Sequence, residues 1–357
     1  MTSFTPSESR FHQTLSHGRT DGPPPIWLMR QAGRYLPEYR ATREQAGGFL
    51  DLCYKPELAC EVTLQPIRRY AFDASILFAD ILIVPDALGQ KTWFEPGEGP
   101  RLEPVKTRDD IAALSVEETT EKFASICESV RLIRAALPQS TALIGFCGAP
   151  WTVATYSVGG RGSPDQAAAR TLAFDEPETM QALIDTLVDA SIRYLNGQID
   201  AGADTVQIFD TWAGSLPDDQ FERWSVAPTK AIVDGVRAHR SDVPIIGFPR
   251  QAGTKLARYV EATGVDGVGC DTTTVLAHAV RDIDPDITLQ GNLDPLLLVA
   301  GGDAMHRRID DILAATRDRR FIFNLGHGIV PQTPPEHVAE LVAHVRGEAL
   351  PTQADNG

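Results

Sequence analysis

Short apolar segments alternate with helical sequence along almost the whole chain. Eight such segments are too short to be core helices and are each followed by residues at helical spacing; they begin at Ile26, Ala74, Ala142, Thr205, Val243, Val265, Ile287 and Phe321. Strict alternation of strands and helices makes the strands parallel, and eight parallel strands predict an α/β fold with a single (β/α)8 TIM barrel. An open doubly wound sheet is the alternative, but nothing in the chain matches its G-x-G-x-x-G phosphate turn.

The rest of the chain fits around one such domain. Its 357 residues suffice for a barrel of about 250 residues with insertions, and no linker-like stretch divides them. We therefore expect a catalytic barrel over residues 25–346. Residues 1–24 are expected to form an N-terminal arm, and residues 347–357 a disordered tail.

Charge and cysteine content exclude several kinds of partner. The formal net charge of −15 argues against binding nucleic acid or an anionic membrane through the overall field. The five cysteines are scattered, with no C-x-x-C pair, which favours free thiols and no zinc site. No apolar run is long enough to span a bilayer, and the polar N-terminus has no signal-peptide core. We expect a soluble, cytoplasmic protein without a metal.

An arginine-rich stretch follows the first predicted strand. It reads Met29-Arg30-Gln31-Ala32-Gly33-Arg34-Tyr35-Leu36-Pro37-Glu38-Tyr39-Arg40. Guanidinium groups offer rigid forks of donors that match carboxylates, so the stretch is typical of a loop that binds an anion. Gly33 lets the backbone turn or approach a ligand, and Pro37 is expected to limit any helix. A surface loop whose arginines pair with nearby carboxylates is the equally open alternative.

Polar residues follow every predicted strand, and in a barrel these positions converge at the carboxyl ends of the strands. The set comprises Arg30, Arg34, Asp80, Trp151, Tyr156, Asp210, Thr211, Arg250, Asp271, Asn292, Asp294 and His327. Such a rim indicates acid–base chemistry on an anionic substrate without a cofactor.

Two members of this set are the strongest candidates for chemistry. Asp80 lies between apolar residues, so its carboxylate is partly desolvated and needs partners, although a structural capping role remains open. His327 is flanked by glycines, which favours ligand contact or proton relay over core packing. Tyr156 could donate its phenol to a substrate or simply pack, and Thr211 alone is a weak signal.

Four motifs in order resemble the uroporphyrinogen decarboxylase family of the haem pathway. They are the Met29–Arg40 stretch, Gly145-Phe146-Cys147-Gly148-Ala149-Pro150-Trp151-Thr152, Leu289-Gln290-Gly291-Asn292-Leu293-Asp294-Pro295 and Asn324-Leu325-Gly326-His327-Gly328. The similarity stays in register from about residue 20 to about residue 345. One departure is Gly159-Gly160-Arg161-Gly162, where the family often has Glu-Gly-Gly-Gly.

The resemblance implies a cofactor-independent barrel enzyme that works as a homodimer. It would remove four acetate carboxyls from the tetrapyrrole uroporphyrinogen, giving coproporphyrinogen and CO₂. Carried over motif by motif, the resemblance places substrate-binding residues at Arg30, Gln31, Ala32, Gly33, Arg34, Asp80, Tyr156, Thr211 and His327, and catalytic roles at Arg30, Asp80, Tyr156 and His327. Asp80 would accept hydrogen bonds from pyrrole N–H groups, and Arg30 would hold the reacting acetate or assist its protonation.

Two other functions remain as alternatives. A related barrel methyltransferase would need a zinc-binding His/Cys set, which the sequence does not offer at this rim. A non-catalytic tetrapyrrole-binding protein would need only the arginine stretch, but it would not explain why Asp80 and His327 converge on the same rim.

Overall fold

The computed structural model describes residues 9–18, 21–95 and 99–349, and a curled parallel sheet lies at its centre. The 7-stranded sheet has the order β1 (Ala74–Ile76), β4 (Ala142–Gly148), β5 (Thr205–Asp210), β6 (Ile245–Pro249), β7 (Gly267–Gly269), β8 (Thr288–Leu293) and β9 (Phe321–Leu325), and every neighbouring pair is parallel. A separate antiparallel hairpin consists of β2 (Thr92–Glu95) and β3 (Gly99–Leu102).

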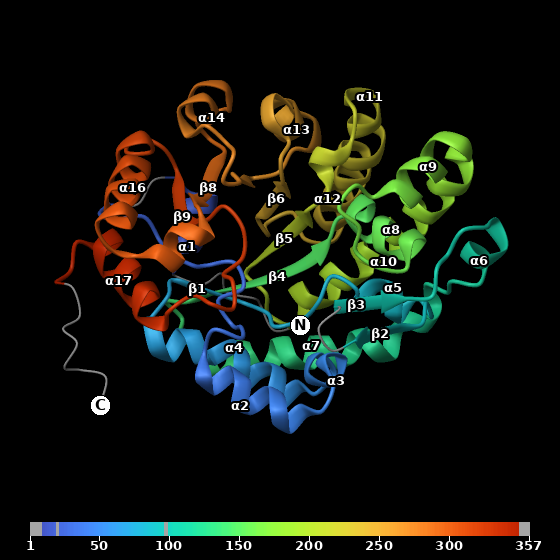
Figure 1. Cartoon of the computed structure of the whole chain (residues 1–357), viewed down its shortest axis with the longest axis horizontal. Coiled ribbons are helices and arrows are strands. Elements are labelled where there is room, and N and C mark those ends of the chain that lie inside the picture. Colours follow the sequence, from blue (N-terminus) through green and yellow to red (C-terminus); the bar gives the residue numbers. More distant parts are fainter. Residues whose placement is uncertain (1–8, 19–20, 96–98, 350–357) are drawn as a thin grey trace.

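Helices lie around the curled sheet (Figure 1). In chain order they are α1 (Arg10–Ser16), α2 (Pro37–Ala46), α3 (Phe49–Tyr54), α4 (Pro56–Tyr70), α5 (Ile83–Ala87), α6 (Arg108–Ala112), α7 (Thr120–Ala136), α8 (Pro150–Gly159), α9 (Ala167–Asp175), α10 (Pro177–Ala201), α11 (Asp218–Phe221), α12 (Ala227–His239), α13 (Leu256–Thr263), α14 (Leu276–Asp282), α15 (Pro295–Ala300), α16 (Gly302–Ala315) and α17 (Pro335–Arg346). All of β4 and β5 is buried, because a parallel sheet covered by helices has no solvent-facing side. Among the described helices, none is long and apolar enough to cross a membrane.

The first predicted strand, Ile26–Met29, is not a strand in the structure. Only its first residue forms a bridge, which is parallel to β9. Farther along, side-chain amides replace the backbone ladder: Met29 N donates to Asn324 Oδ1 at 2.9 Å, and Leu28 N donates to Gln31 Oε1 at 3.1 Å. Because these acceptors belong to side chains, the segment leaves strand geometry just before the arginine stretch. The other seven predicted strands are confirmed.

Pro37 begins a helix rather than limiting one. It occupies the first turn of α2, where the missing N–H is harmless because the first donors of a helix have no partner within it. Pro150 likewise starts α8, a helix that the sequence analysis did not expect and that carries Tyr156. Proline signals a helix start as readily as a helix end, and only the packing around it distinguishes the two.

Part of the expected N-terminal arm is the helix α1. It joins the core through Phe11 and Leu15, which are both buried. The remainder of the arm at residues 1–8 and 19–20, and most of the expected tail at residues 350–357, lie outside the described residues.

An aspartate directly before a strand ties that strand to its neighbour. Asp204 precedes β5; its N–H donates to Leu143 O at 2.8 Å, and its Oδ2 accepts from Leu143 N at 2.7 Å. Arg134 on α7 donates to the same carboxylate oxygen at 2.8 Å. One carboxylate therefore joins β4, β5 and a covering helix.

The same arrangement recurs before β7 and before β1. Asp266 exchanges backbone and carboxylate hydrogen bonds with the first residue of β6, and Arg237 on α12 pairs with it at 3.0 Å. Asp73 exchanges such bonds with Ile26, and Arg346 on α17 pairs with it at 3.4 Å. The segment at Ile26 is therefore bonded to β1 as β4 is bonded to β5.

Removing these carboxylates should destabilise the protein in the order of their burial. The Asp204 side chain is 2% exposed and that of its partner Arg134 is 18% exposed, so Asp204→Ala leaves a largely buried guanidinium without its carboxylate. We expect the free energy of unfolding to fall by about 3–5 kcal/mol. Removing Asp266, which is 36% exposed, should cost about 1 kcal/mol. Asp73, which is 19% exposed, should lie in between.

Urea denaturation of the three alanine variants measures this order. Asp234→Ala on α12 is the matched control, because the pair of Asp234 with Lys230 is more than half exposed on the outer surface. That change should cost less than about 1 kcal/mol. Equal losses at all three strand positions would contradict the view that burial sets their contribution.

Candidate active site

The carboxyl ends of the strands carry the polar residues that the sequence analysis singled out. Asp80 follows β1, Thr211 follows β5 and His327 follows β9, while Tyr156 lies on α8 directly after β4. Because parallel strands end at the same edge of a sheet, these residues share one rim.

Arg30 is held in an unusual backbone conformation at this rim. Its φ is 62°, in the left-handed region that residues with a side chain rarely adopt. Its aliphatic stem lies over Gly328, where a Cβ would come within 2.3 Å of Arg30 Cδ. Its guanidinium is exposed and forms no ion pair with any residue in the described part of the chain. Gly328 therefore makes room beside His327 for an arginine whose guanidinium has no ion-pair partner among the described residues.

A buried amide anchors the start of the arginine stretch. Gln31 is buried, and its side chain accepts from Leu28 N and donates to Ala74 O at 3.2 Å, so it holds the stretch against β1 instead of facing the rim. The backbone N–H groups of Ala32 and Gly33 have no acceptor within residues 9–18, 21–95 and 99–349. Successive free amides in a turn form a concavity suited to anions.

Asp80 is the acidic centre of the rim. Its Oδ1 accepts from Leu82 N at 2.8 Å beside the start of α5, and its Oδ2 has no partner among the described residues. Burial raises the pKa of the Asp80 carboxyl, while the Leu82 N–H and the charge of Arg30 oppose this rise. A half-buried carboxylate with one free oxygen is a strong acceptor for the N–H groups of a ligand.

Close packing brings α8, the helix that carries Tyr156, against the loop that carries Asp80. Gly148 ends β4, and a Cβ there would lie 2.7 Å from Val153 on α8 and 2.8 Å from Ile81, the residue after Asp80. The missing side chain at Gly148 therefore lets α8 and the Asp80 loop approach each other. Burial raises the pKa of Tyr156, so its phenol keeps its proton at neutral pH and can donate it in a hydrogen bond.

His327 is neutral in this setting. Burial, together with the charges of Arg30 and Arg250, lowers the pKa of His327 to about 4, against an opposing effect of Asp271. Its Nδ1 is buried and has no hydrogen-bond partner in the part of the chain that the structure describes. A buried ring nitrogen without a partner is costly, and a ligand at the rim could supply that partner.

Electrostatic coupling gathers four of the predicted residues into one group. The charge of Arg30 acts on Asp80, Tyr156 and His327, and the charge of Asp80 acts on Tyr156. The arrangement combines a cation, a carboxylate and two neutral groups that can hydrogen-bond. Such a set can bind an anionic substrate and stabilise a positive charge that develops on it.

Two predicted residues are not tied to this group by a described contact. Arg34 is exposed, and its charge acts on Tyr39. Thr211 is half-buried, and its hydroxyl has no hydrogen bond within the described ranges. Their roles stay predictions.

Two other residues at the rim received no role from the sequence. Arg250 follows β6 and Asp271 follows β7, and both charges act on His327. Asp271 is buried, and its carboxylate accepts hydrogen bonds from Thr273 N at 2.7 Å and from Gln251 N. Their positions directly after strands were the available signal, but sequence alone could not separate them from the other rim residues.

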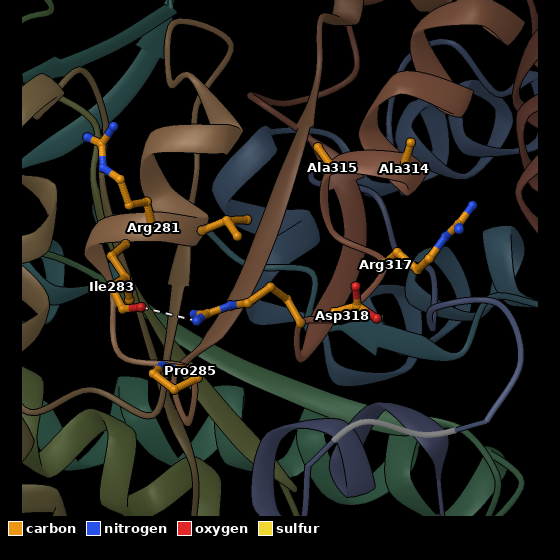
Figure 2. Close-up of a pocket in the computed structure, with 9 residues that line it drawn as sticks. Arg281, Ile283, Pro285, Ala314, Ala315, Arg317 and Asp318 are labelled. Carbon is orange, nitrogen blue, oxygen red and sulfur yellow. Dashed lines mark hydrogen bonds between the residues drawn. The ribbon is translucent and has the colours of Figure 1, made fainter.

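A cavity of about 380 Å³ lies elsewhere, beside the segments that lead into β8 and β9 (Figure 2). The guanidinium groups of Arg281 and Arg317 point away from each other in this view. Arg319 is committed to backbone carbonyls, including Ile283 O at 3.1 Å. The cations of this cavity do not converge on one ligand, and it is remote from the rim. Within the described residues, no group of three or more His, Cys, Asp or Glu could hold a metal ion.

Solved structures resemble this chain in fold. A methyltransferase from Methanosarcina mazei matches with a TM-score of 0.73 at 18% identity, covering 95% of this chain and 98% of that chain. A putative vitamin-B12-independent methionine synthase from Listeria monocytogenes matches with a TM-score of 0.52 at 13% identity, covering 91% of this chain and 94% of that chain. At these identities the likeness concerns the α/β architecture with its curled parallel sheet, and nothing more.

Sequence relatives are much closer. The family model described as Uroporphyrinogen decarboxylase (URO-D) matches residues 6–347. A protein named uroporphyrinogen decarboxylase from Rhodospirillum rubrum is 53% identical over 340 residues, which cover 95% of this chain and 97% of that protein. Another of the same name from Sphingopyxis alaskensis is 55% identical over 331 residues, covering 93% of this chain and 95% of that protein. The resemblance seen in the motifs is confirmed, and the chain belongs to the uroporphyrinogen decarboxylase family of enzymes.

Proposed function

We propose that this chain removes the four acetate carboxyls of uroporphyrinogen III, giving coproporphyrinogen III and CO₂ in porphyrin biosynthesis. The observation that carries the proposal is an uncommitted Arg30 acting on Asp80, whose Oδ2 has no partner among the described residues. Relatives that carry this enzyme's name are more than half identical to the chain, which supports the same assignment.

The arginine stretch would bind the carboxylates of the substrate. Each charge-assisted hydrogen bond to a carboxylate contributes roughly 1.5–3 kcal/mol, so several of them hold and orient a flexible tetrapyrrole. Arg30 is the best placed to hold the reacting acetate, because its charge reaches Asp80 and His327. Arg34 and the free N–H groups of Ala32 and Gly33 would bind carboxylates farther out.

Loss of CO₂ from a pyrrole acetate requires a place for the electron pair of the breaking C–C bond. Protonation of the adjacent ring carbon makes the pyrrole cationic; the bond to CO₂ then breaks, and its electron pair neutralises the ring. A second proton then completes the methyl group, and the ring carbon releases the first proton, which restores the aromatic pyrrole. The Asp80 carboxylate would accept hydrogen bonds from pyrrole N–H groups and stabilise the cation electrostatically. Arg30 is a poor proton donor because a guanidinium stays charged.

Tyr156 and His327 would complete the site as neutral hydrogen-bonding groups. The phenol of Tyr156 keeps its proton because burial raises its pKa. The free Nδ1 of His327 would gain a partner from the substrate. The hydroxyl of Thr211 would add a further contact from the end of β5.

We also propose that residues 25–346 form one closed (β/α)8 domain, in which the segment at Ile26 fills the eighth strand position. One support is the aspartate arrangement, since Asp73 joins Ile26 to β1 as Asp204 joins β4 to β5. A second support lies on the other side of the segment, where the backbone N–H of Phe323 in β9 donates to Pro25 O at 2.9 Å.

The family likeness extends the proposal to a cytoplasmic homodimer that needs no cofactor. Sedimentation equilibrium of the purified chain should give twice the chain mass. A chain that sediments as a monomer at micromolar concentration would contradict the dimer without affecting the proposed reaction.

The reaction itself can be tested on purified, metal-stripped protein incubated anaerobically with uroporphyrinogen. We expect products with progressively fewer carboxyls, from eight to four, when they are oxidised and separated by carboxyl number. Unchanged substrate that co-elutes with the protein would indicate a tetrapyrrole-binding protein instead. Activity that returns only on adding a metal would contradict a cofactor-free enzyme.

Asp80→Asn should lower kcat at least about 100-fold with a smaller change in KM, because it keeps the shape of the side chain and removes the charge that stabilises the cation. Steady-state turnover of uroporphyrinogen measures both constants. Asp284→Asn is the matched control: Asp284 is exposed in the segment that leads into β8, away from the rim, and accepts from Asp286 N at 2.8 Å, as Asp80 accepts from Leu82 N. A kcat of Asp80→Asn within a few fold of this control would refute the electrostatic role.

Burial lowers the pKa of His327 to about 4, so we expect its ring to take up a proton near pH 4 in the folded protein. An unfolded histidine binds a proton near pH 6.5, so between about pH 6.5 and pH 4 the unfolded chain holds the extra proton. The free energy of unfolding therefore falls as the pH falls through this window. NMR titration of the ring Cε1–H, assigned with His327→Gln, measures the midpoint. A midpoint near 6.5 would place His327 outside a buried site.

A further inference from the structure

Backbone hydrogen bonds hold Arg250, one of the arginines at the rim, to the neighbouring segments. Its N–H donates to Asp210 O at 3.0 Å and to Phe248 O at 3.1 Å, and its carbonyl accepts from Gly214 N at 3.0 Å. These bonds connect the end of β6 to β5 and to the segment that follows β5. The Cα of Arg250 is thus fixed by its neighbours on one side.

The residue after Arg250, Gln251, is itself held in place and so fixes the backbone of Arg250 on its C-terminal side. Gln251 has a φ of 59°, which a residue with a side chain rarely adopts, and its N–H donates to the buried carboxylate of Asp271. A Cβ at Gly214 would lie 2.4 Å from Gln251 Cβ and 3.1 Å from Arg250 O, so the two segments are in close contact. Strain of this kind persists only where surrounding contacts hold it, and it clusters at functional sites.

The side chain of Arg250 contrasts with this fixed backbone. It is half-buried, yet its guanidinium has no ion pair or hydrogen bond to any described residue. Arg134, also largely buried, is paired with Asp204 at 2.8 Å. In a chain with a net charge of −15, carboxylate partners are abundant, so a half-buried arginine without one is unusual. Its headgroup is available to an anion from outside the protein.

The position of Arg250 complements that of Arg30. Arg250 follows β6, and Arg30 follows the segment that bridges to β9, so β7, β8 and β9 separate the two arginines along the sheet. Both charges nevertheless act on His327. The two arginines therefore approach the same histidine from different sides of the rim.

We propose that Arg250 binds a second carboxylate of the substrate, across the site from the carboxylate held by Arg30. This inference rests on the proposed function and adds a residue to its binding site. The substrate carries carboxylates all around a flexible ring, so one arginine stretch on one side leaves the far side unanchored. A guanidinium carried by a fixed backbone on the far side would set the orientation of the ring over Asp80. Arg250 is a substrate-positioning residue, and the bond-breaking step does not pass through it.

Arg250→Gln should raise KM for uroporphyrinogen by about 10- to 100-fold, the loss expected for one charge-assisted hydrogen bond to a carboxylate. The kcat should stay within about threefold, because the reacting acetate and the Asp80 contact are unchanged. Arg250→Lys keeps the charge but loses the planar fork, and its KM should fall between those of the wild type and Arg250→Gln. Steady-state kinetics on the full-length chain separate the two constants.

Arg307→Gln is the matched control. Arg307 is exposed on α16 and has no partner in the described part of the chain, so the variant makes the same charge change away from the rim. It should leave KM within twofold of wild type. A KM of Arg250→Gln equal to that of this control would overturn the inference, as would a loss confined to kcat.

A second readout needs no substrate. Removing the positive charge at position 250 should raise the NMR titration midpoint of His327 in the ligand-free protein, and Arg307→Gln should leave it unchanged. An unmoved midpoint in a folded Arg250→Gln variant would show that Arg250 does not face the site. Wild-type protein that fails to turn over uroporphyrinogen would instead refute the proposed function, while normal turnover with an unchanged KM in Arg250→Gln would refute only this inference.

Discussion

The hydrogen bonds between a pre-strand aspartate and the backbone of the neighbouring strand are the constraint on which the rest of this structure depends. Asp73, Asp204 and Asp266 each stand one residue before a strand, and each both accepts from and donates to the neighbouring segment. A slip of one residue would break both bonds and would turn the strand's side chains to the opposite face. These carboxylates therefore help to fix the register of three neighbouring pairs of segments, and register decides which residues emerge at the rim.

Arginines pair with these aspartates at one end of the sheet, and other arginines line the candidate site at the other end. Three of them, on α7, α12 and α17, are paired with the aspartates at the amino ends of the strands. At the carboxyl ends, Arg30 and Arg250 have no such partner in the described chain. The same residue type thus stabilises one end of the sheet and remains free at the other. The physical difference is whether a carboxylate of the protein lies within reach, as it does for the three arginines that pair with the aspartates before β1, β5 and β7.

Much of the fold could be predicted from the sequence because strand–helix alternation is a local pattern. Seven of the eight predicted strands lie where short apolar runs stand in the chain. The exception, Ile26–Met29, has the same apolar pattern, but the N–H groups of its last two residues bond to the side-chain amides of Gln31 and Asn324. Asn324 is far away in the sequence, so its effect on Met29 could not be foreseen. Helix α8 was missed for another reason: its residues are almost all buried, so the sequence shows no amphipathic spacing there.

The candidate site was predictable as a list and not as an arrangement. Positions after predicted strands, together with the family resemblance, singled out Arg30, Asp80, Tyr156 and His327. The structure couples these four residues electrostatically. Gln31 belongs to the same motif as Arg30, yet its amide is buried against β1. The residues on either side of Gln31 lie at the surface. The residue type alone could not predict that the glutamine side chain would be buried instead.

By itself, the sequence determined the alternation of strands and helices, the family, and the residue types gathered at the rim, because each of these is written in short local patterns. Only the tertiary structure decided which charges are left without a partner. Burial lowers the pKa of His327, a Cβ-sized gap at Gly328 admits Arg30, and a clamped backbone holds Arg250 beside them. Desolvation and close approach depend on atoms brought together from distant parts of the chain, so they exist only once the chain has folded.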